Sequence, residues 1–198
     1  RIGLVYLAAA GAYLYFERRG RAIAGATLLL GYWAAMTLIP VPGFGAGDLS
    51  PEANLAAWID RIVMPGRLWQ GTWDPEGLLS TFPAIVTSLL GIMTGEWLQA
   101  ERDGSATSRG MVAAGVALTV VGVLWGLMFP INKNLWTSSY VVFTAGTALL
   151  LLGSMHWLID VRRFRGPWHT WMVVYGMNAI AVFVASGMLT KTLVRIRI

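Results

Sequence analysis

Six apolar runs separated by polar segments organise the chain. Five of them are each roughly 18 to 23 residues long, enough for a helix to cross about 30 Å of hydrocarbon, and the first run is shorter. Because backbone groups in hydrocarbon need hydrogen bonds within their own segment, these runs predict helices. The predicted fold is all-α: a polytopic membrane helical bundle with about six transmembrane helices, forming a single membrane domain over residues 1–198. The runs are Ile2–Phe16, Ala22–Ile39, Leu78–Leu98, Met111–Phe129, Thr137–Ile159 and Thr170–Leu189.

The first run, Ile2–Phe16, is short for a membrane crossing. A secretory signal peptide would end in small residues at a cleavage site, but the charged segment Glu17–Arg21 follows instead. We therefore interpret this run as the surviving end of a longer helix. The chain is expected to be a fragment of a longer protein, truncated at both ends.

The segment Pro40–Gly77 is the only long connection, and a loop of this length is uncommon unless it has a function. Within it, Ser50, Pro51 and Glu52 have the order typical of a helix start. The following helix lies either in the membrane interface or over the outer ends of the other helices, and both alternatives stay open. Its apolar stripe is Leu55, Trp58, Ile59, Ile62 and Val63, and its polar side is Glu52, Asp60 and Arg61.

Composition indicates lipid as the main solvent, since 56% of the residues are apolar and 13% are charged, against about 25% charged in an ordinary domain. The net charge of +5 is unevenly distributed: eight basic residues lie in the first, third and fifth connections, and three lie in the other two. This bias predicts that the first group faces the cytoplasm. We expect an integral membrane protein, with the lipid bilayer and not nucleic acid as its partner. The eight are Arg18, Arg19, Arg21, Arg102, Arg109, Arg162, Arg163 and Arg165, and the three are Arg61, Arg67 and Lys133.

Small residues recur at helical spacing in the third and fourth runs. Such ridges let membrane helices approach closely, and they would permit a homodimer contact. No internal repeat is evident, which argues against an inverted-repeat transporter. The ridges are Ser80, Ala84 and Ser88; Thr87, Gly91 and Gly95; and Gly122 with Gly126.

The first polar cluster, Trp73–Gly77, lies at the start of the third run on the predicted outer side. Asp74 and Glu76 could bind a cationic or hydroxylated substrate, or serve as acid and base. The alternative is structural: Asp74 caps the helix, Pro75 takes its first position and Glu76 favours the helix dipole.

The second cluster, Pro130–Trp136, is also on the predicted outer side, where Lys133 is flanked by Asn132 and Asn134. One interpretation has the Lys133 side chain reaching the interface, an asparagine capping the next helix and Trp136 in the aromatic belt. In the other, Lys133 holds a carboxylate or neutralises developing negative charge.

The third candidate is Asn178, an amide within the sixth run that would tie helices together if buried. His156 and His169 have no neighbouring carboxylate or serine at triad-like spacing, so both are interpreted as interfacial residues. Cysteine is absent, which excludes disulfides, thiolate metal sites and cysteine nucleophiles, and no bound metal is expected.

Several of these segments together resemble the transmembrane acyltransferase family of heparan-α-glucosaminide N-acetyltransferase and its bacterial relatives. The Asn-Lys-Asn-Leu-Trp sequence is the most specific of them, and the resemblance extends over nearly the whole chain. The matching segments are Trp73–Thr81, Pro130–Val141 and Gly176–Ile180, with Tyr32-Trp33 and Pro40–Gly43 resembling the bacterial branch.

The resemblance implies transfer of an acetyl group from cytoplasmic acetyl-coenzyme A to an amino sugar on the far side of the membrane. Its bacterial branch implies a location in the bacterial inner membrane. Family members have about eleven membrane helices and a catalytic histidine in their N-terminal part. Neither His156 nor His169 matches its context, so this C-terminal portion alone is expected to be inactive. An amino-sugar permease and a non-catalytic scaffold are the alternatives. The residues expected to line the substrate site are Asp74, Glu76, Asn132, Lys133, Asn134 and Asn178.

Overall fold

The computed structural model describes residues 1–100 and 103–196. Arg102, which contributes to the predicted charge asymmetry, lies outside the described residues. The chain divides into two compact units, Arg1–Ser154 and Met155–Ile198.

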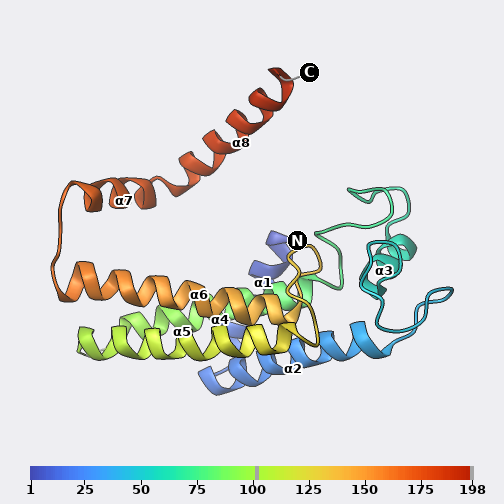
Figure 1. Cartoon of the computed structure of the whole chain (residues 1–198), viewed down its shortest axis with the longest axis horizontal. Coiled ribbons are helices and arrows are strands. Elements are labelled where there is room, and N and C mark those ends of the chain that lie inside the picture. The colour runs from blue at the N-terminus through green and yellow to red at the C-terminus, as the bar shows by residue number, and fades with distance from the viewer. Residues whose placement is uncertain (101–102, 197–198) are drawn as a thin grey trace. The chain divides into compact units, whose positions relative to one another are not determined.

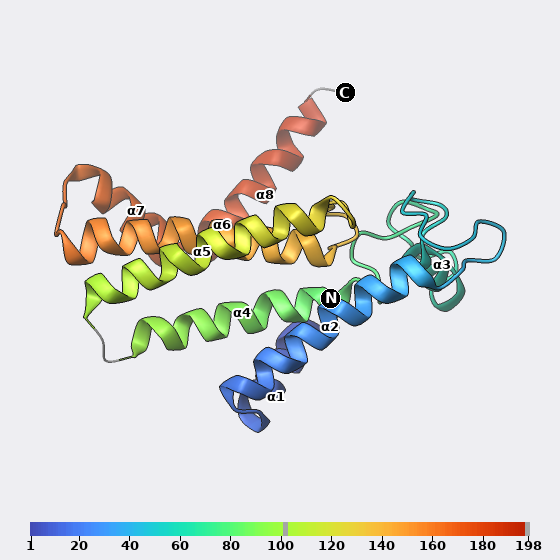
Figure 2. The same ribbon diagram turned by 60° about the horizontal axis from the view of Figure 1, so that its bottom comes forward.

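The first unit is built from helices, as the apolar runs predicted (Figures 1 and 2). Among residues 1–100 and 103–196 there is no β-strand, and the pairing of Val41 with Gly45 is an isolated bridge. The all-α prediction is confirmed. Its helices are α1 (Ile2–Tyr15), α2 (Arg18–Leu38), α3 (Leu55–Val63), α4 (Thr81–Gln99), α5 (Gly104–Gly126) and α6 (Ser138–His156), the last ending two residues into the second unit.

The second unit continues from α6 through a short π-helical segment, Trp157–Val161, and contains α7 (Pro167–Met177) and α8 (Ala179–Ile196). The sixth apolar run is therefore not one continuous helix. The two helices are bent by 82° at the break between them. Asn178 lies in that break and has neither helical nor left-handed backbone angles.

Three helical segments are long and apolar enough to cross a membrane: α2, α5 and Ser138–Val161. The bent pair α7–α8 would make a fourth if it counts as one span, and α1 is a shorter apolar helix. Membrane-helix character is thus confirmed, whereas the predicted count of six spans is not.

Helices α5 and α6 approach each other closely at glycines. A Cβ at Gly122 would lie 2.6 Å from the Cα of Phe143, and one at Gly146 would collide with the backbone of Thr119. The prediction for Gly122 is therefore confirmed. Within the described part of the chain no atom lies close to Gly91 or Gly95 of α4, since a Cβ at either would have nothing within 4 Å.

A buried apolar cluster joins α3 to the ends of the longer helices. In Figures 1 and 2, α3 lies close to the C-terminal end of α2. Leu55 of α3 packs in this cluster, while Ile62 and Val63 are each 58% exposed. The observed packing favours the second alternative for α3, a helix seated over the ends of other helices. The buried members are Tyr32, Met36, Val41, Leu55, Ala56, Phe129 and Leu135.

An ion pair joins α2 to α4 at the ends of these helices that are remote from α3. The Nη2 of Arg21 donates to both carboxylate oxygens of Glu96, at 2.6 and 2.8 Å. Arg21 starts α2 and Glu96 ends α4, so the first and third connections lie at the same end of the unit. Helices that run in alternating directions place their first and third connections at the same end. The observed arrangement therefore agrees with the prediction that these two connections face the same side.

Candidate functional site

The turn around Asp74 is built by its own side chain. One carboxylate oxygen of Asp74 accepts from the backbone N–H of Glu76 at 2.8 Å, and the other accepts from that of Trp69 at 3.3 Å. Helix α4 begins only at Thr81, with Ser80 before it. The expectation that Asp74 caps this helix is therefore wrong, and Glu76 is left exposed at the surface of the turn.

A buried carboxyl stands behind this turn. Asp60 of α3 is 1% exposed, so its assignment to the polar side of α3 is wrong. Its Oδ1 accepts from the backbone N–H of Leu78 at 2.9 Å, and its Oδ2 is buried without a hydrogen-bond partner among the described residues. Burial raises the pKa of Asp60, although the hydrogen bond from Leu78 acts in the other direction.

Helix α3 holds the same loop at a second point. Arg61 donates to the backbone carbonyls of Thr72 and Glu52, at 2.9 and 2.8 Å. Asn54 caps the helix by accepting from the N–H of Ala57, four residues after the predicted cap Ser50. Helix α3 therefore holds in place the loop that carries Asp74 and Glu76.

The turn between α5 and α6 is shaped by Asn132 and Thr137. The side-chain oxygen of Asn132 accepts from the N–H groups of Asn134 and Leu135, at 2.8 and 3.3 Å. Thr137 donates to the carbonyl of Pro130 and accepts, at 3.4 Å, from the third residue of α6. The predicted asparagine cap is therefore a threonine cap, and Asn132 has a structural role in the turn.

Lys133 and Asn134 lie on the exposed side of this turn. Within the described part of the chain, their side chains make no hydrogen bond or ion pair. Both are therefore available to a ligand. Arg67, by comparison, is an exposed cation in the loop before Asp74.

Arg1 joins the two polar turns, which the sequence did not indicate. Its Nη1 donates to the carbonyl of Pro75 at 2.6 Å and to the hydroxyl of Ser80 at 3.3 Å. Its guanidinium lies over the ring of Trp136, 4.3 Å from the centroid. We call these four residues the Arg1 cluster.

Charge and burial act in opposite directions on the pKa of Arg1. Burial lowers the pKa of Arg1, and the negative charges of Glu76 and Asp74 act to raise it. Both carboxylates are therefore near enough for their field to act at the guanidinium, as Coulomb interactions at partly buried sites allow.

The ring of Trp136 is fixed in place by unusual backbone and side-chain contacts. Trp136 has a φ of 52°, a left-handed conformation that is rare for a bulky residue. Its indole N–H donates to the hydroxyl of Thr87 in α4 at 3.1 Å, and Tyr140 packs edge-on, with 5.3 Å between the ring centroids. Trp136 and Tyr140 also line a cavity of about 580 Å³ between α4 and α6, a size typical of small-molecule pockets.

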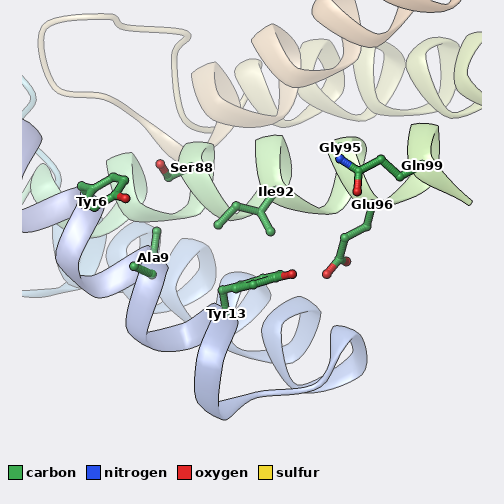
Figure 3. Close-up of a pocket in the computed structure, with 9 residues that line it drawn as sticks. Tyr6, Ala9, Tyr13, Ser88, Ile92, Gly95, Glu96 and Gln99 are labelled. Atoms are coloured by element: carbon green, nitrogen blue, oxygen red, sulfur yellow. The ribbon is translucent and has the colours of Figure 1, made fainter.

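A second cavity, of about 410 Å³, lies between α1 and α4 (Figure 3). The hydroxyl of Tyr13 points toward the carboxylate of Glu96, and Tyr6 and Gln99 also line the space. The guanidinium of Arg21 lies 5.0 Å from the ring centroid of Tyr13. Glu96 is near the end of α4 that is remote from Asp74, so its polar groups do not join those of the Arg1 cluster.

The remaining candidates lie in the second unit. The side-chain amide of Asn178 donates to the carbonyl of Val174 at 2.8 Å, a contact within its own unit. His169 lies edge-on to Trp168, 6.3 Å between centroids, and His156 ends α6. In residues 1–100 and 103–196, no three His, Asp or Glu side chains gather in a way that could hold a metal ion.

Comparison with known proteins identifies relatives for most of the chain. No family model matches it. The heparan-alpha-glucosaminide N-acetyltransferase of Mus musculus is 31% identical over 191 residues, and that of Homo sapiens is 32% identical over 193 residues. Each match covers 79% of this chain and 28% of the relative, so the chain spans less than a third of the length of the curated relatives it matches. The chain therefore has a family relationship with the heparan-α-glucosaminide N-acetyltransferases, as its motifs predicted.

Proposed function

We propose that the chain is part of a transmembrane acetyltransferase. The complete protein would transfer an acetyl group from cytoplasmic acetyl-coenzyme A to the amine of an amino sugar on the outer side of a bacterial inner membrane. The names of the two relatives support the reaction class. The excess of basic residues in the first, third and fifth connections supports the orientation.

The observation that carries this proposal is the meeting of the two polar turns. Arg1 contacts both Pro75, between Asp74 and Glu76, and Trp136, at the end of the turn that holds Lys133. The sequence separates the turns by more than fifty residues, yet one side chain contacts both. A substrate bound at this end of the unit would therefore meet both carboxylates and amides.

The chemistry assigns a role to each type of group. An acceptor amine must lose a proton before its nitrogen attacks the thioester carbonyl; the C–N bond then forms, the C–S bond breaks and the thiol of coenzyme A leaves. Asp74 and Glu76 would hold and orient the amine, and Lys133 would stabilise negative charge developing on the carbonyl oxygen. The catalytic histidine is expected in the part of the protein that precedes this chain.

Two amides complete the proposed lining of the substrate site in the first unit. Asn132 and Asn134 belong to the same turn as Lys133 and would accept from or donate to sugar hydroxyls. Asn178, in the second unit, stays a prediction from its sequence motif. A homodimer and a bound acetyl-coenzyme A are further parts of the proposal, and no residue of this chain is assigned to the donor.

The test compares two cationic variants in the complete protein. Acetyl transfer from labelled acetyl-coenzyme A to glucosamine is measured for Lys133→Ala and for Arg67→Ala, which removes an exposed cation from the other loop on the same predicted side. We expect Lys133→Ala to lower turnover about ten- to a thousand-fold, within the range for loss of one charge-stabilising group, and Arg67→Ala to leave it unchanged. Equal effects of the two variants would remove Lys133 from the proposed site.

A permease is the second candidate, and the break between α7 and α8 favours it. Transporters often build their substrate sites at discontinuous membrane helices, and the bend of 82° at Asn178 is such a discontinuity. Uptake of labelled glucosamine into proteoliposomes without any acetyl donor would support the permease. Acetyl transfer without net uptake would support the acetyltransferase.

A further inference from the structure

We propose that the Arg1 cluster is a cation-binding site, that the guanidinium of Arg1 occupies it in this structure, and that the protonated amine of the acceptor competes for the same position. Its ligand class is a primary ammonium group. The inference rests on the proposed function only for the identity of the acceptor as an amino sugar.

Every group that the described contacts place against the guanidinium attracts positive charge. The carbonyl of Pro75 can only accept a hydrogen bond. The hydroxyl of Ser80 donates its own proton to the carbonyl of Gly77, at 3.1 Å, so toward Arg1 it presents a lone pair. The face of the Trp136 ring is negative and binds cations.

The cluster is organised before a ligand arrives. Ser80 is 2% exposed, and its hydroxyl is fixed by the bond to Gly77. The left-handed backbone of Trp136 and the hydrogen bond from its indole to Thr87 hold the ring in one orientation. Strained backbone of this kind gathers at binding sites, where the surrounding structure maintains it.

Nearby carboxylates favour a positive charge at this position. Glu76 and Asp74 both act on the guanidinium, as the opposing influences on its pKa indicate. An ammonium group has three donors, enough for the carbonyl of Pro75 and the hydroxyl of Ser80 with one left for a carboxylate. An uncharged N-acetyl group offers one N–H and no charge, so the site distinguishes substrate from product.

Competition gives the inference its distinguishing consequence. If Arg1 occupies the position of the ligand, removing its side chain makes the site accessible, and amine affinity rises. If Arg1 were itself a ligand-binding group, the same change would lower that affinity. The sign of the effect therefore separates the two roles.

The first experiment is a titration of the purified chain in nanodiscs with D-glucosamine, with N-acetylglucosamine as the uncharged control. Binding is followed through the indole NMR signal of Trp136 in labelled protein. We expect Arg1→Ala to bind glucosamine about three- to thirty-fold more tightly than the unmodified chain, and neither to bind N-acetylglucosamine. Unchanged or weaker binding by Arg1→Ala would overturn the proposal.

Matched variants distinguish loss of the binding site from loss of the fold. In the Arg1→Ala background, Glu76→Gln changes an exposed side chain, and we expect it to weaken glucosamine binding severalfold. Trp136→Leu should abolish binding, measured by calorimetry, while Trp69→Leu, at a position 80% exposed, should leave it unchanged. Glucosamine affinity that is unchanged by Glu76→Gln, or binding that persists in Trp136→Leu, would overturn the proposal.

Kinetics of the complete protein separate this inference from the proposed function. We expect Arg1→Ala to lower the KM for the amine acceptor, because the guanidinium no longer competes with the amine for the site. Glucosamine binding by the chain together with absent acetyl transfer would refute the acetyltransferase and leave the cation site standing. Acetyl transfer with a KM that does not respond to Arg1→Ala would refute the cation site alone.

Discussion

A methyl group added at Gly77 would meet the buried carboxyl of Asp60. An ideal Cβ at this position would lie 2.7 Å from the Cγ of Asp60 and would collide with Oδ2. The carboxyl cannot move away freely, because Asp60 is 1% exposed and its other oxygen accepts the N–H of Leu78. Gly77→Ala must therefore displace the carboxyl, the turn or both.

The expected loss of stability follows from these contacts. Overpacking in a filled interior costs about 1 to 3 kcal/mol, and a hydrogen bond to a charged group contributes about 1.5 to 3 kcal/mol. Because one displacement causes both losses, we expect about 2.5 to 6 kcal/mol for Gly77→Ala. At about 2 to 4 °C per kcal/mol for a chain of this size, the midpoint of thermal unfolding in detergent should fall by about 5 to 24 °C.

The matched control is Gly91→Ala, since a Cβ there has nothing within 4 Å and alanine favours helix α4. Its midpoint should stay the same or rise. Truncating the carboxyl as well, in Gly77→Ala with Asp60→Ala, should lose less than the sum of the two single changes, because the methyl then has room. Equal midpoints for Gly77→Ala and Gly91→Ala, or strict additivity of the pair, would refute this account of the turn.

Three further predictions concern the first unit. Burial raises the folded-state pKa of Asp60, so the stability that its protonated form contributes is present below the unfolded-state pKa and is lost as pH rises through the folded-state pKa. The thermal unfolding midpoint of the unmodified chain minus that of Asp60→Asn should therefore shrink as pH is raised from 4 to 8. Arg21→Met should destabilise the chain by about 3 to 5 kcal/mol by leaving Glu96 without its partner, and Arg21→Met with Glu96→Met should be closer to the unmodified chain in thermal unfolding. Gly122→Ala should cost about 1 to 3 kcal/mol, whereas Gly91→Ala should not destabilise, and equal midpoints would contradict the close approach of α5 and α6.

The burial of Asp60 illustrates a limit of pattern analysis. A charged residue is expected to face water, and the apolar stripe of α3 placed Asp60 on the other side. One feature of the spacing indicated burial: Asp60 lies four residues after the apolar Ala56, so the two share a face of the helix. What overrides the expectation is the backbone N–H of Leu78, which reaches the carboxyl only when the loop folds back over α3.

Asn178 shows the complementary difficulty. Its neighbours are apolar, so the pattern predicted an uninterrupted helix with a buried amide. In the structure the helix breaks at this residue, and the side chain bonds the carbonyl of Val174 instead of a neighbouring helix. Asparagine competes for backbone hydrogen bonds in this way, but composition alone does not decide whether it ends a helix.

The apolar pattern was enough to predict the all-α membrane character, and the charge pattern and motifs predicted the common side of the first and third connections and the family relationship. Apolar length and spacing are local properties, and hydrocarbon leaves the backbone few alternatives to a helix. The meeting of Arg1, Ser80 and Trp136 at one cluster is visible only in the folded chain, because these contacts join residues up to 135 positions apart. Contacts of that kind depend on how packed helices and folded turns place their side chains, and no local pattern encodes that placement.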